Sequence, residues 1–466
     1  MMPTQDADLL ISDGTVVTQN DQRDIIDRGA VAVQGATIVA VGPADLLEGR
    51  YRARRTIDAR GQFVFPGLIN THTHLFQTFI KGLGQGLSLY EWVDSIAAPS
   101  SVEMTRREAY LSALLGGLEA LRCGTTTVLD FMYSMPATHL YREVARAFAD
   151  LGLRGILGLG LMETGEQHDL SPCQFRPVSE ALAEWSDLGP ELSTELITPA
   201  LAPEIAFGIT RSGLRQIRRF ASDKNMLITI HINEVDDDDR AMLADYGQRC
   251  IPFLEQLGFW GPDVLAVHCV KLQPEDIDIF GRHGVKVSHN PVSNMYLGVG
   301  VAPIGKMIEA GLTVSLATDG AGSNNSQDML EAMKCAGLLH RLWAQDPAAT
   351  SAQMILDVAT LGGAEAIGRS DSLGSLEAGK QADLFLFDPL RPKATPVLDP
   401  VSTLVFSSGT DSVTTTVVAG TVLLDGGKVT TVDETDVLRE CQAAAWTLAR
   451  RAGTERLLPA KGYRYA

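Results

Sequence analysis

The chain has 466 residues, of which 45% are hydrophobic and 21% charged, a composition typical of ordinary globular proteins. Its net charge of −18 argues against a nucleic-acid-binding protein, because such proteins carry a basic surface. The chain contains no apolar run of about 18 residues, so we expect no membrane span. The N-terminus lacks the basic and apolar regions of a secretion signal.

The six cysteines are scattered along the chain without a C-x-x-C pair. This usage predicts free thiols in a cytoplasmic protein, and it argues against a zinc site built from cysteines.

Both ends of the chain contain short β-type runs. Residues 9–11 and 15–18 flank Asp13-Gly14, a dipeptide typical of hairpin turns. Similar runs follow at 30–33, 37–41, 382–387 and 414–424. We therefore predict one small β-sandwich domain formed by residues 1–62 and 376–430. A helix from about Glu434 to Ala452 is predicted within the remaining segment, 431–466.

The middle of the chain alternates between apolar strand-like runs and helical patterns such as 107–115 and 304–309. Eight alternating units are typical of a (β/α)8 TIM barrel in the α/β class, which we predict over residues 63–375. Strands of such a sheet are buried on both faces, which accounts for their nearly continuous hydrophobicity. The strand-like runs are 63–72, 125–132, 154–161, 196–203, 227–233, 264–270, 285–289 and 314–319.

Polar residues with metal-binding or acid–base chemistry follow several of these runs. Strand alternation places residues i and i+2 on one side, so His72 and His74 can bind one metal ion together. The carboxyl ends of barrel strands meet at one face, where active sites form. Five of the nine histidines fall at such ends. The full set is His72 and His74, His231 with Glu234, His268, His289, and Asp319.

Imidazole and carboxylate ligands without thiolates suit Zn²⁺, and also Fe²⁺, Co²⁺ or Mn²⁺. A metal ion with an open coordination position lowers the pKa of bound water and supplies hydroxide near neutral pH. A carboxylate must then move protons, and Glu234 stands three residues after His231.

These residues resemble the amidohydrolase superfamily. The resemblance is strongest to the branch with triazine hydrolases and chlorohydrolases, phenylurea and thiocarbamate hydrolases, and deaminases of S-adenosylhomocysteine, methylthioadenosine, guanine and cytosine. It spans roughly residues 9 to 430. The matching stretches are 66–74, 123–127, 268–270, 289–294, 300–303, 318–320, 323–325 and 377–384.

The resemblance implies roles for individual residues. The implied ligands of a single divalent ion, with zinc as the first expectation, are His72, His74, His231 and Asp319. Glu234 would take a proton from the attacking water, His268 would orient that water or polarise the substrate, and Asp319 would share the proton work. Binuclear relatives carry a lysine on the fourth strand, and residues 196–204 contain none, so we expect one metal ion per chain.

Substrate contacts are predicted at His289, Asn294 and Ser323, with a structural role in the loops as the alternative. Gln77, in the stretch after the first strand, and Trp92 are further candidates. Aromatic residues near a barrel mouth can stack on planar ligands. Trp92 can equally belong to the core. The four other histidines, His139, His168, His283 and His340, are expected on the surface or in loops. Residues 236–239, all aspartate, are expected to be a solvated helix start.

One departure from the resemblance bears on the substrate. Nucleoside deaminases of this branch carry a Pro-x-Glu segment whose glutamate binds the ribose hydroxyls, and Ser101 follows Pro99-Ser100 at that place. Loss of such a carboxylate disfavours nucleosides. The leading hypothesis is therefore a mononuclear metal-dependent hydrolase that cleaves a C–N, C–S or C–Cl bond of an N-substituted urea, thiocarbamate or s-triazine.

Two alternatives remain open. One is a hydrolytic deaminase of a purine, pterin, pyrimidine or S-adenosylhomocysteine-type substrate. The other, from a different class, is a non-catalytic scaffold that keeps the barrel. By resemblance we also expect a homo-oligomer whose only other partner is a small-molecule substrate.

Overall fold

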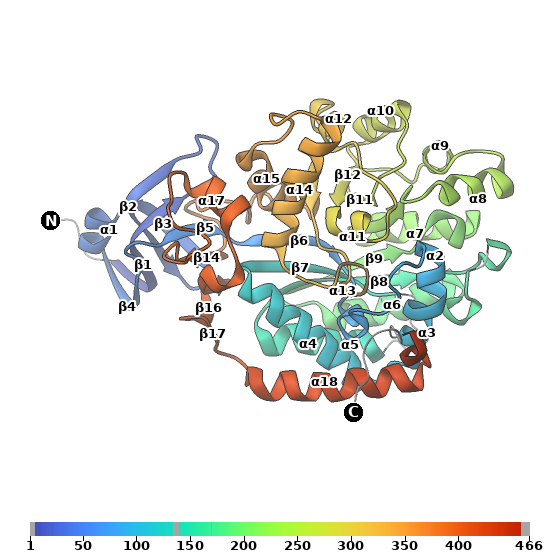
Figure 1. The fold of residues 1–466 in the computed structure, drawn as a ribbon, viewed down its shortest axis with the longest axis horizontal. Coiled ribbons are helices and arrows are strands. Elements are labelled where there is room, and N and C mark those ends of the chain that lie inside the picture. Colours follow the sequence, from blue (N-terminus) through green and yellow to red (C-terminus); the bar gives the residue numbers. More distant parts are fainter. Residues whose placement is uncertain (1–4, 134–138, 169, 458–466) are drawn as a thin grey trace.

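The computed structural model describes residues 5–133, 139–168 and 170–457, which form a barrel and a separate β sheet (Figure 1). The barrel has eight parallel strands that pair with their neighbours in chain order, as the alternating sequence pattern predicts. The predicted fold class is therefore confirmed. The strands are β6 (Leu68–Thr73), β7 (Thr125–Phe131), β8 (Arg154–Leu161), β9 (Ile197–Pro203), β10 (Ile228–Ile232), β11 (Val264–His268), β12 (Lys286–His289) and β13 (Val314–Leu316).

Helices cover the outside of the barrel (Figure 1). The N-terminal turn of α4 is closed by a capping box in which Thr105 and Glu108 bond reciprocally. The longer helices of this layer are α4 (Arg106–Arg122), α5 (His139–Leu151), α6 (Val178–Leu192), α7 (Arg211–Lys224), α8 (Asp236–Tyr246), α10 (Pro274–His283), α14 (Met329–Ala344) and α15 (Ala352–Ala359). The shorter ones are α2 (Leu89–Trp92), α3 (Ala98–Glu103), α9 (Cys250–Gln256), α11 (Pro291–Tyr296), α12 (Ile304–Glu309), α13 (Ala321–Asn324) and α16 (Leu361–Ala366).

The first and last barrel strands, β6 and β13, meet at a seam joined largely by side chains. The Asn70 amide donates to Thr318 Oγ1 at 2.8 Å, and the Thr71 hydroxyl donates to the Leu316 carbonyl at 3.2 Å. A backbone bond from the Asp319 N–H to the His72 carbonyl, 3.1 Å, lies at the carboxyl end of the seam. The barrel is thus nearly closed, and its seam runs directly into the predicted site.

The second sheet is mixed and is built from both ends of the chain. Its order is β17-β16-β15-β14-β5-β1-β2-β3, with β4 paired to β1. The strands from the N-terminal end are β1 (Gln5–Val17), β2 (Ile25–Gln34), β3 (Thr37–Pro43), β4 (Tyr51–Asp58) and β5 (Phe63–Pro66), with helix α1 (Ala44–Arg50) between β3 and β4. Those from the C-terminal end are β14 (Leu384–Phe387), β15 (Val413–Val418), β16 (Thr421–Asp425) and β17 (Lys428–Val429), with α17 (Pro400–Ser407) after β14.

Two predictions about this region are corrected. The apolar run 63–72 is two strands: β5 pairs with β14 and β1 in the terminal sheet, and the chain passes through Gly67 into β6 of the barrel. The predicted Asp13-Gly14 hairpin is instead a register shift inside the single strand β1, where Asp13 takes a φ of 61°. Asp-Gly tolerates positive φ, so the same dipeptide can form a β-bulge as readily as a hairpin turn.

A buried ion pair joins the two sheets. Arg154, on β8, makes two bonds of 3.0 and 3.1 Å to the carboxylate of Asp383, and each side chain is at most 5% exposed. Asp383 also accepts a hydrogen bond from the Ala419 N–H at 2.8 Å. This pair fixes the start of β14 against the amino end of the barrel.

We expect Asp383→Ala to destabilise the protein by about 3–5 kcal/mol, because the variant leaves Arg154 buried without its counter-charge. Urea unfolding measures this as a lower midpoint. The matched control is Asp425→Ala, whose partner Arg55 and whose own carboxylate are both nearly half exposed. That control should cost less than about 1 kcal/mol. Equal midpoints for the two variants would contradict the assignment.

The last long helix, α18 (Glu434–Arg451), begins and ends within one residue of the predicted helix. It lies along the barrel beside α4 (Figure 1). Arg122 of α4 forms a two-bond ion pair with Glu434, and Arg451 reaches Glu108. Asp433 caps the helix by accepting from the Asp436 N–H. The C-terminal helix therefore belongs to the outer layer of the barrel.

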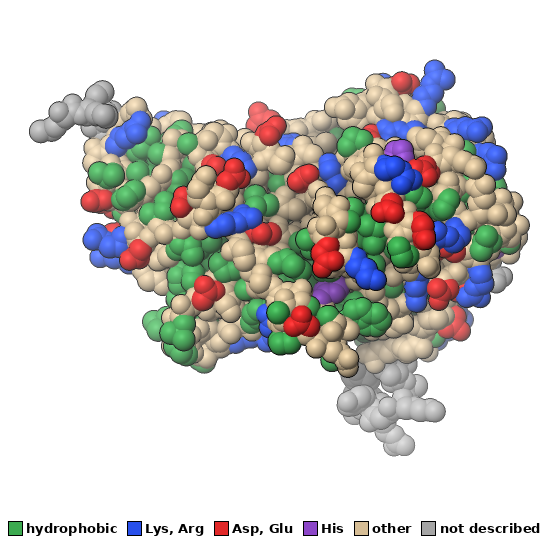
Figure 2. Space-filling model, turned by 90° about the horizontal axis from the view of Figure 1, so that it is seen from above, with side chains coloured by type: hydrophobic (Ala, Val, Ile, Leu, Met, Phe, Trp, Pro, Cys, Tyr) green, Lys and Arg blue, Asp and Glu red, His purple; other side chains and the backbone are tan. Residues whose placement is uncertain are grey.

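The surface carries acidic and basic side chains side by side on the face shown in Figure 2. Many of them form ion pairs, such as Arg282 with Glu255. The six cysteines are all free thiols. In the described part of the chain, no helix is both long and apolar enough to cross a membrane.

Candidate metal centre

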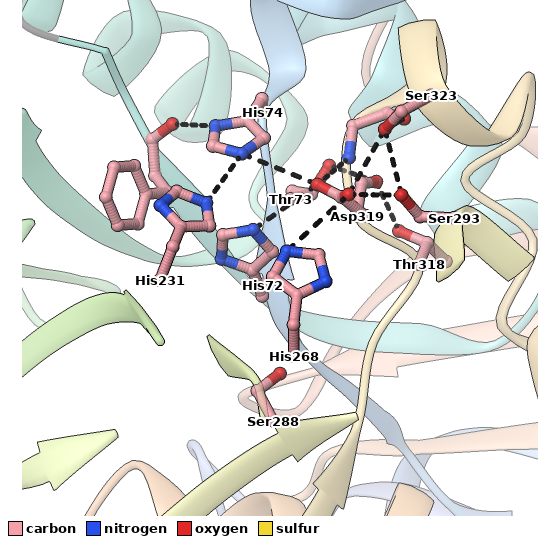
Figure 3. Close-up of polar contacts among 12 residues, drawn as sticks. His72, Thr73, His74, His231, His268, Ser288, Ser293, Thr318, Asp319 and Ser323 are labelled. Atoms are coloured by element: carbon pink, nitrogen blue, oxygen red, sulfur yellow. Dashed lines mark hydrogen bonds and ion pairs between the residues drawn. The ribbon is translucent and has the colours of Figure 1, made fainter. Parts of the chain in front are cut away.

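Four side chains converge at the carboxyl end of the barrel (Figure 3). His72 and His74 come from the end of β6, His231 from β10, and Asp319 from the loop after β13. Asp319 Oδ1 lies 3.3 Å from His72 Nε2 and 3.4 Å from His74 Nε2, and the Nε2 atoms of His74 and His231 are 3.3 Å apart. The four residues predicted as metal ligands are thus together in one cluster.

Hydrogen bonds fix which ring nitrogens face the cluster. His74 Nδ1 donates to the Phe131 carbonyl at 2.6 Å, and His231 Nδ1 donates to the Glu204 carbonyl at 2.7 Å. Each ring therefore presents an unprotonated Nε2, and these two lone pairs point at each other with no proton between them. His72 Nε2 is also buried, and the atom that faces it is Asp319 Oδ1 at 3.3 Å. A cation between these atoms would satisfy the facing lone pairs and the carboxylate together.

The spacing fits such a cation. Zinc binds nitrogen at about 2.0–2.1 Å in a tetrahedron, which places ligand atoms about 3.3 Å apart. That is the separation between the His74 and His231 nitrogens. The arrangement therefore suits a divalent ion with imidazole and carboxylate ligands, which His72, His74, His231 and Asp319 could hold.

The protonation states of these side chains agree with a metal site. Burial lowers the pKa of both His72 and His74 to about 3, so the imidazoles are neutral at physiological pH. Burial opposes ionisation of Asp319, but the hydrogen bond to His72 and the surrounding imidazoles hold its pKa well below the ordinary value. Neutral imidazoles and an ionised carboxylate are the forms that bind metal.

Asp319 is oriented by a second set of residues. Its Oδ2 accepts hydrogen bonds from the hydroxyls of Ser293, 2.6 Å, and Ser323, 3.1 Å, and its Oδ1 accepts from the Gly320 N–H at 2.6 Å (Figure 3). Ser323, predicted to contact substrate or to have a structural role in its loop, thus contacts Asp319. Ser293 was missed by the sequence analysis, although it lies in a motif that was singled out.

Three residues at the same face have strained backbone conformations. Asn233, His268 and Asp319 have φ values of 46°, 68° and 62°, which residues other than glycine rarely adopt. Each costs of order 1–3 kcal/mol, and such strain persists where the surrounding structure enforces a functional geometry.

Glu234 and His268 lie next to the cluster. Glu234 Oε2 is 3.5 Å from His268 Nε2, and His268 Nε2 is 4.0 Å from Asp319 Oδ2. Burial raises the pKa of Glu234, and burial lowers that of His268. Asn294 Oδ1 accepts a hydrogen bond from His268 Nδ1 at 2.9 Å, so Asn294 lies behind the imidazole and fixes its tautomer.

We expect Asn294→Ala to lower turnover by about 10–100-fold while the metal content stays unchanged, because the variant frees the His268 ring to rotate. The measurement is kcat together with metal per chain. Asn294→Asp, which keeps an acceptor oxygen, should recover part of the loss. Normal turnover by the alanine variant would show that the orientation of His268 is unimportant.

A cavity of about 60 Å³ opens beside His231 and Glu234. Its polar lining includes Tyr133, Glu204 and Asp238, none of which was predicted as a site residue. Glu204 directly follows β9, so the strand-end rule that found the histidines also indicates this residue. The other lining residues are Leu89, Tyr90, Val93, Met162, Leu170 and Ile205.

Asp238 corrects the prediction for the acidic run. Residues 236–239 do begin helix α8, but Asp238 points inward and is 5% exposed. Its carboxylate accepts from the Tyr90 hydroxyl at 2.6 Å and from the Glu234 N–H at 2.8 Å. Burial raises the pKa of Asp238 to about 6.

The remaining candidates fall in different places. Gln77 is buried near the site, where its amide donates to the Tyr133 hydroxyl at 3.4 Å. Trp92 belongs to the hydrophobic core, beside Ile96, as its alternative interpretation held. His289 is buried, and its Nε2 lies 2.9 Å from that of His340.

His340 was expected on the surface and is in fact 6% exposed. Its helix α14 turns this residue toward the barrel, which the local sequence did not reveal. His168 and His283 pair with Asp245 and Glu255 and keep part of their surface exposed. The side chain of His139 lies outside the described residues.

Comparison with known proteins agrees with the fold. Residues 63–423 match the model of the amidohydrolase family. A 5′-deoxyadenosine deaminase from Methanosarcina mazei is 35% identical over 448 residues, which cover 96% of this chain and 100% of that protein.

Two solved structures superpose closely. An adenosine deaminase from Xanthomonas campestris with bound zinc has a TM-score of 0.90 at 28% identity, covering 96% of this chain and 100% of that one. A zinc-containing mutant of atrazine chlorohydrolase from Arthrobacter aurescens, complexed with atraton, has a TM-score of 0.88 at 27% identity, covering 94% and 100%.

The family match and the named relatives, together with this cluster, identify a metal-dependent hydrolase of carbon–nitrogen bonds other than peptide bonds. The chain belongs to the amidohydrolase family. The family and the intact ligand set weigh against the non-catalytic scaffold. Within the family, the relatives support the deaminase alternative better than the urea, thiocarbamate or triazine hypothesis that led the sequence analysis.

Proposed function

We propose that the protein is a mononuclear, zinc-dependent deaminase that hydrolyses the amino group of a purine carried on a 5′-modified nucleoside. The observation that carries the proposal is the cluster of unprotonated Nε2 atoms and the Asp319 carboxylate, with Glu234 and His268 beside it. The 35% identity to a 5′-deoxyadenosine deaminase over nearly the whole of both chains supports the substrate class.

The residues suit this chemistry. An ion held by His72, His74, His231 and Asp319 would make water acidic enough to supply hydroxide near neutral pH. Glu234 takes the proton of the attacking water and delivers it to the departing amine. His268 hydrogen-bonds to the oxygen that attacks. Water adds to the ring carbon that bears the amino group, the C–N bond breaks, and ammonia leaves with a ring carbonyl as product.

The cavity also suits an aminated ring. Its apolar side, with Val93, Met162 and Ile205, can pack on a planar base. Its polar side carries the carboxylates of Glu204 and Glu234, which accept hydrogen bonds from amino groups. An acidic cavity favours a substrate rich in N–H donors.

Ser101 supports a second candidate, hydrolysis of an s-triazine or N-substituted urea. It stands where the resemblance expects a ribose-binding glutamate, and its hydroxyl donates to the Ala98 carbonyl and accepts from Gln174. The atrazine chlorohydrolase neighbour points the same way.

The test is a substrate panel with the zinc-loaded protein, followed by mass spectrometry and ammonia release. The panel contains adenosine, 5′-deoxyadenosine and 5′-methylthioadenosine beside an aminated triazine, a phenylurea and a thiocarbamate. Conversion of the purines to their oxo forms with equimolar ammonia supports the proposal. Release of an aniline, dialkylamine or thiol instead would contradict the deaminase proposal and support the second candidate.

A further inference from the structure

Tyr90, on the short helix α2, lines two separate hollows. The inner one is the cavity of about 60 Å³ that contains His231 and Glu234. The outer one is a hollow of about 390 Å³, lined also by His168, Phe207 and Arg240. The Tyr90 ring thus stands between the metal cluster and the larger hollow outside it.

The inner cavity is too small for the substrate in this conformation. About 60 Å³ has room for about four to six water molecules, whereas sites for small ligands span several hundred Å³. An aminated ring can therefore reach Glu234 only if part of the wall moves.

Tyr90 is held in place by one carboxylate. Its hydroxyl donates to Asp238 Oδ1 at 2.6 Å, and Asp238 Oδ2 accepts from the Glu234 N–H at 2.8 Å. The Tyr90 ring also makes an edge contact with Phe207, at a centroid distance of 6.2 Å. The residue that closes the cavity is thus connected through Asp238 to the backbone of the proton carrier.

The neighbouring residues show which part can move. Trp92, two residues further along α2, is buried in the core between Gly84 and Gly322, and it anchors the helix. Tyr90 itself is only partly buried and borders the outer hollow. Rotation of the Tyr90 side chain therefore opens the wall without unfolding α2.

We propose that Tyr90 is a specificity-determining gate between the two hollows, held closed by its hydrogen bond to Asp238. Its side chain limits the size of the substituent that a substrate carries toward the outer hollow. The identity of that substrate rests on the proposed function, but the access path does not. Opening the gate also releases Asp238, so entry of substrate and the position of Glu234 are linked.

Access is tested first without any substrate. The rate at which 1,10-phenanthroline removes zinc from the loaded protein is compared for wild type, Tyr90→Phe and Tyr90→Ala. Loss of one hydrogen bond should speed removal about fivefold in Tyr90→Phe, and loss of the ring about tenfold or more in Tyr90→Ala. The matched control is Tyr110→Phe, which removes a Tyr–Asp bond of 2.8 Å to Asp150 on the barrel exterior and should not change the rate.

Wild-type rates for both Tyr90 variants, with intact folding by circular dichroism, would overturn the gate. So would an equal acceleration in the Tyr110 control. The second measurement is the kcat/KM ratio between a bulky 5′-substituted adenosine and adenosine itself, which Tyr90→Ala should raise. An unchanged ratio would remove the specificity role. If no purine is turned over at all, the proposed function fails, while the chelator rates still decide the gate.

Discussion

Replacing His72 by alanine is expected to give a folded protein that holds no metal ion and has lost at least about a thousandfold in activity. His72 is fully buried, and its Nε2 faces the Asp319 carboxylate at 3.3 Å. Removing this ring takes away one of the converging donors, and the metal ion supplies several kcal/mol of the catalytic effect. Metal per chain by atomic spectrometry and turnover of the best panel substrate measure the two effects together.

The control for this variant is His283→Ala. His283 lies on α10, is partly exposed and pairs with Glu255 at 3.1 Å, so its loss should affect neither metal nor turnover. An active His72→Ala protein with a full complement of metal would show that the cluster is assigned to the wrong residues. Circular dichroism separates loss of metal from loss of fold.

Glu234→Gln is expected to differ from His72→Ala in its metal content: zinc is retained, while turnover falls by about 10²–10⁴-fold. Glutamine keeps the shape of the side chain but cannot accept and return a proton. The Glu234 carboxylate belongs to neither of the two groups of side chains whose ligand atoms lie close enough to hold an ion, so its neutralisation leaves the ligands intact. Zinc content and single-turnover rates measure the two properties separately.

Glu275→Gln, an exposed position on α10, controls for the general effect of removing one negative charge. Near-normal turnover by Glu234→Gln would exclude Glu234 as the proton carrier and leave His268 or Asp319 for that task. Loss of zinc from the same variant would instead place Glu234 among the ligands.

Much of the barrel is predictable because its signal repeats. Each barrel strand is an apolar run, several of these runs are followed by polar residues, and this pattern places His231, His268 and Asp319 at one face. Parallel strands in a closed sheet must bring those ends together, so spacing along the chain becomes proximity in space. The i, i+2 spacing of His72 and His74 gave the same result within one strand.

The features that could not be predicted depend on packing across the fold. The run 63–72 is continuous in hydrophobicity, so only the pairing of β5 with β14 reveals that it serves two sheets. His340 resembles a surface histidine in sequence, but its helix presses it against His289. Asp238 looks like one of four equivalent acids, and only the direction of the first turn of α8 turns it inward.

The seam between β6 and β13 has a consequence for folding. The chain separates His72 from Asp319 by almost the whole barrel, and few backbone bonds join the two strands that carry them. Contacts so distant in sequence form late and slowly, because a long loop must close first. A bound ion would link the first strand to the last, so it would add its binding energy to the closed barrel alone. The same ion that activates water would then also hold the barrel closed. We expect metal-depleted protein to lose the contacts between β6 and β13 before the rest of the fold unfolds.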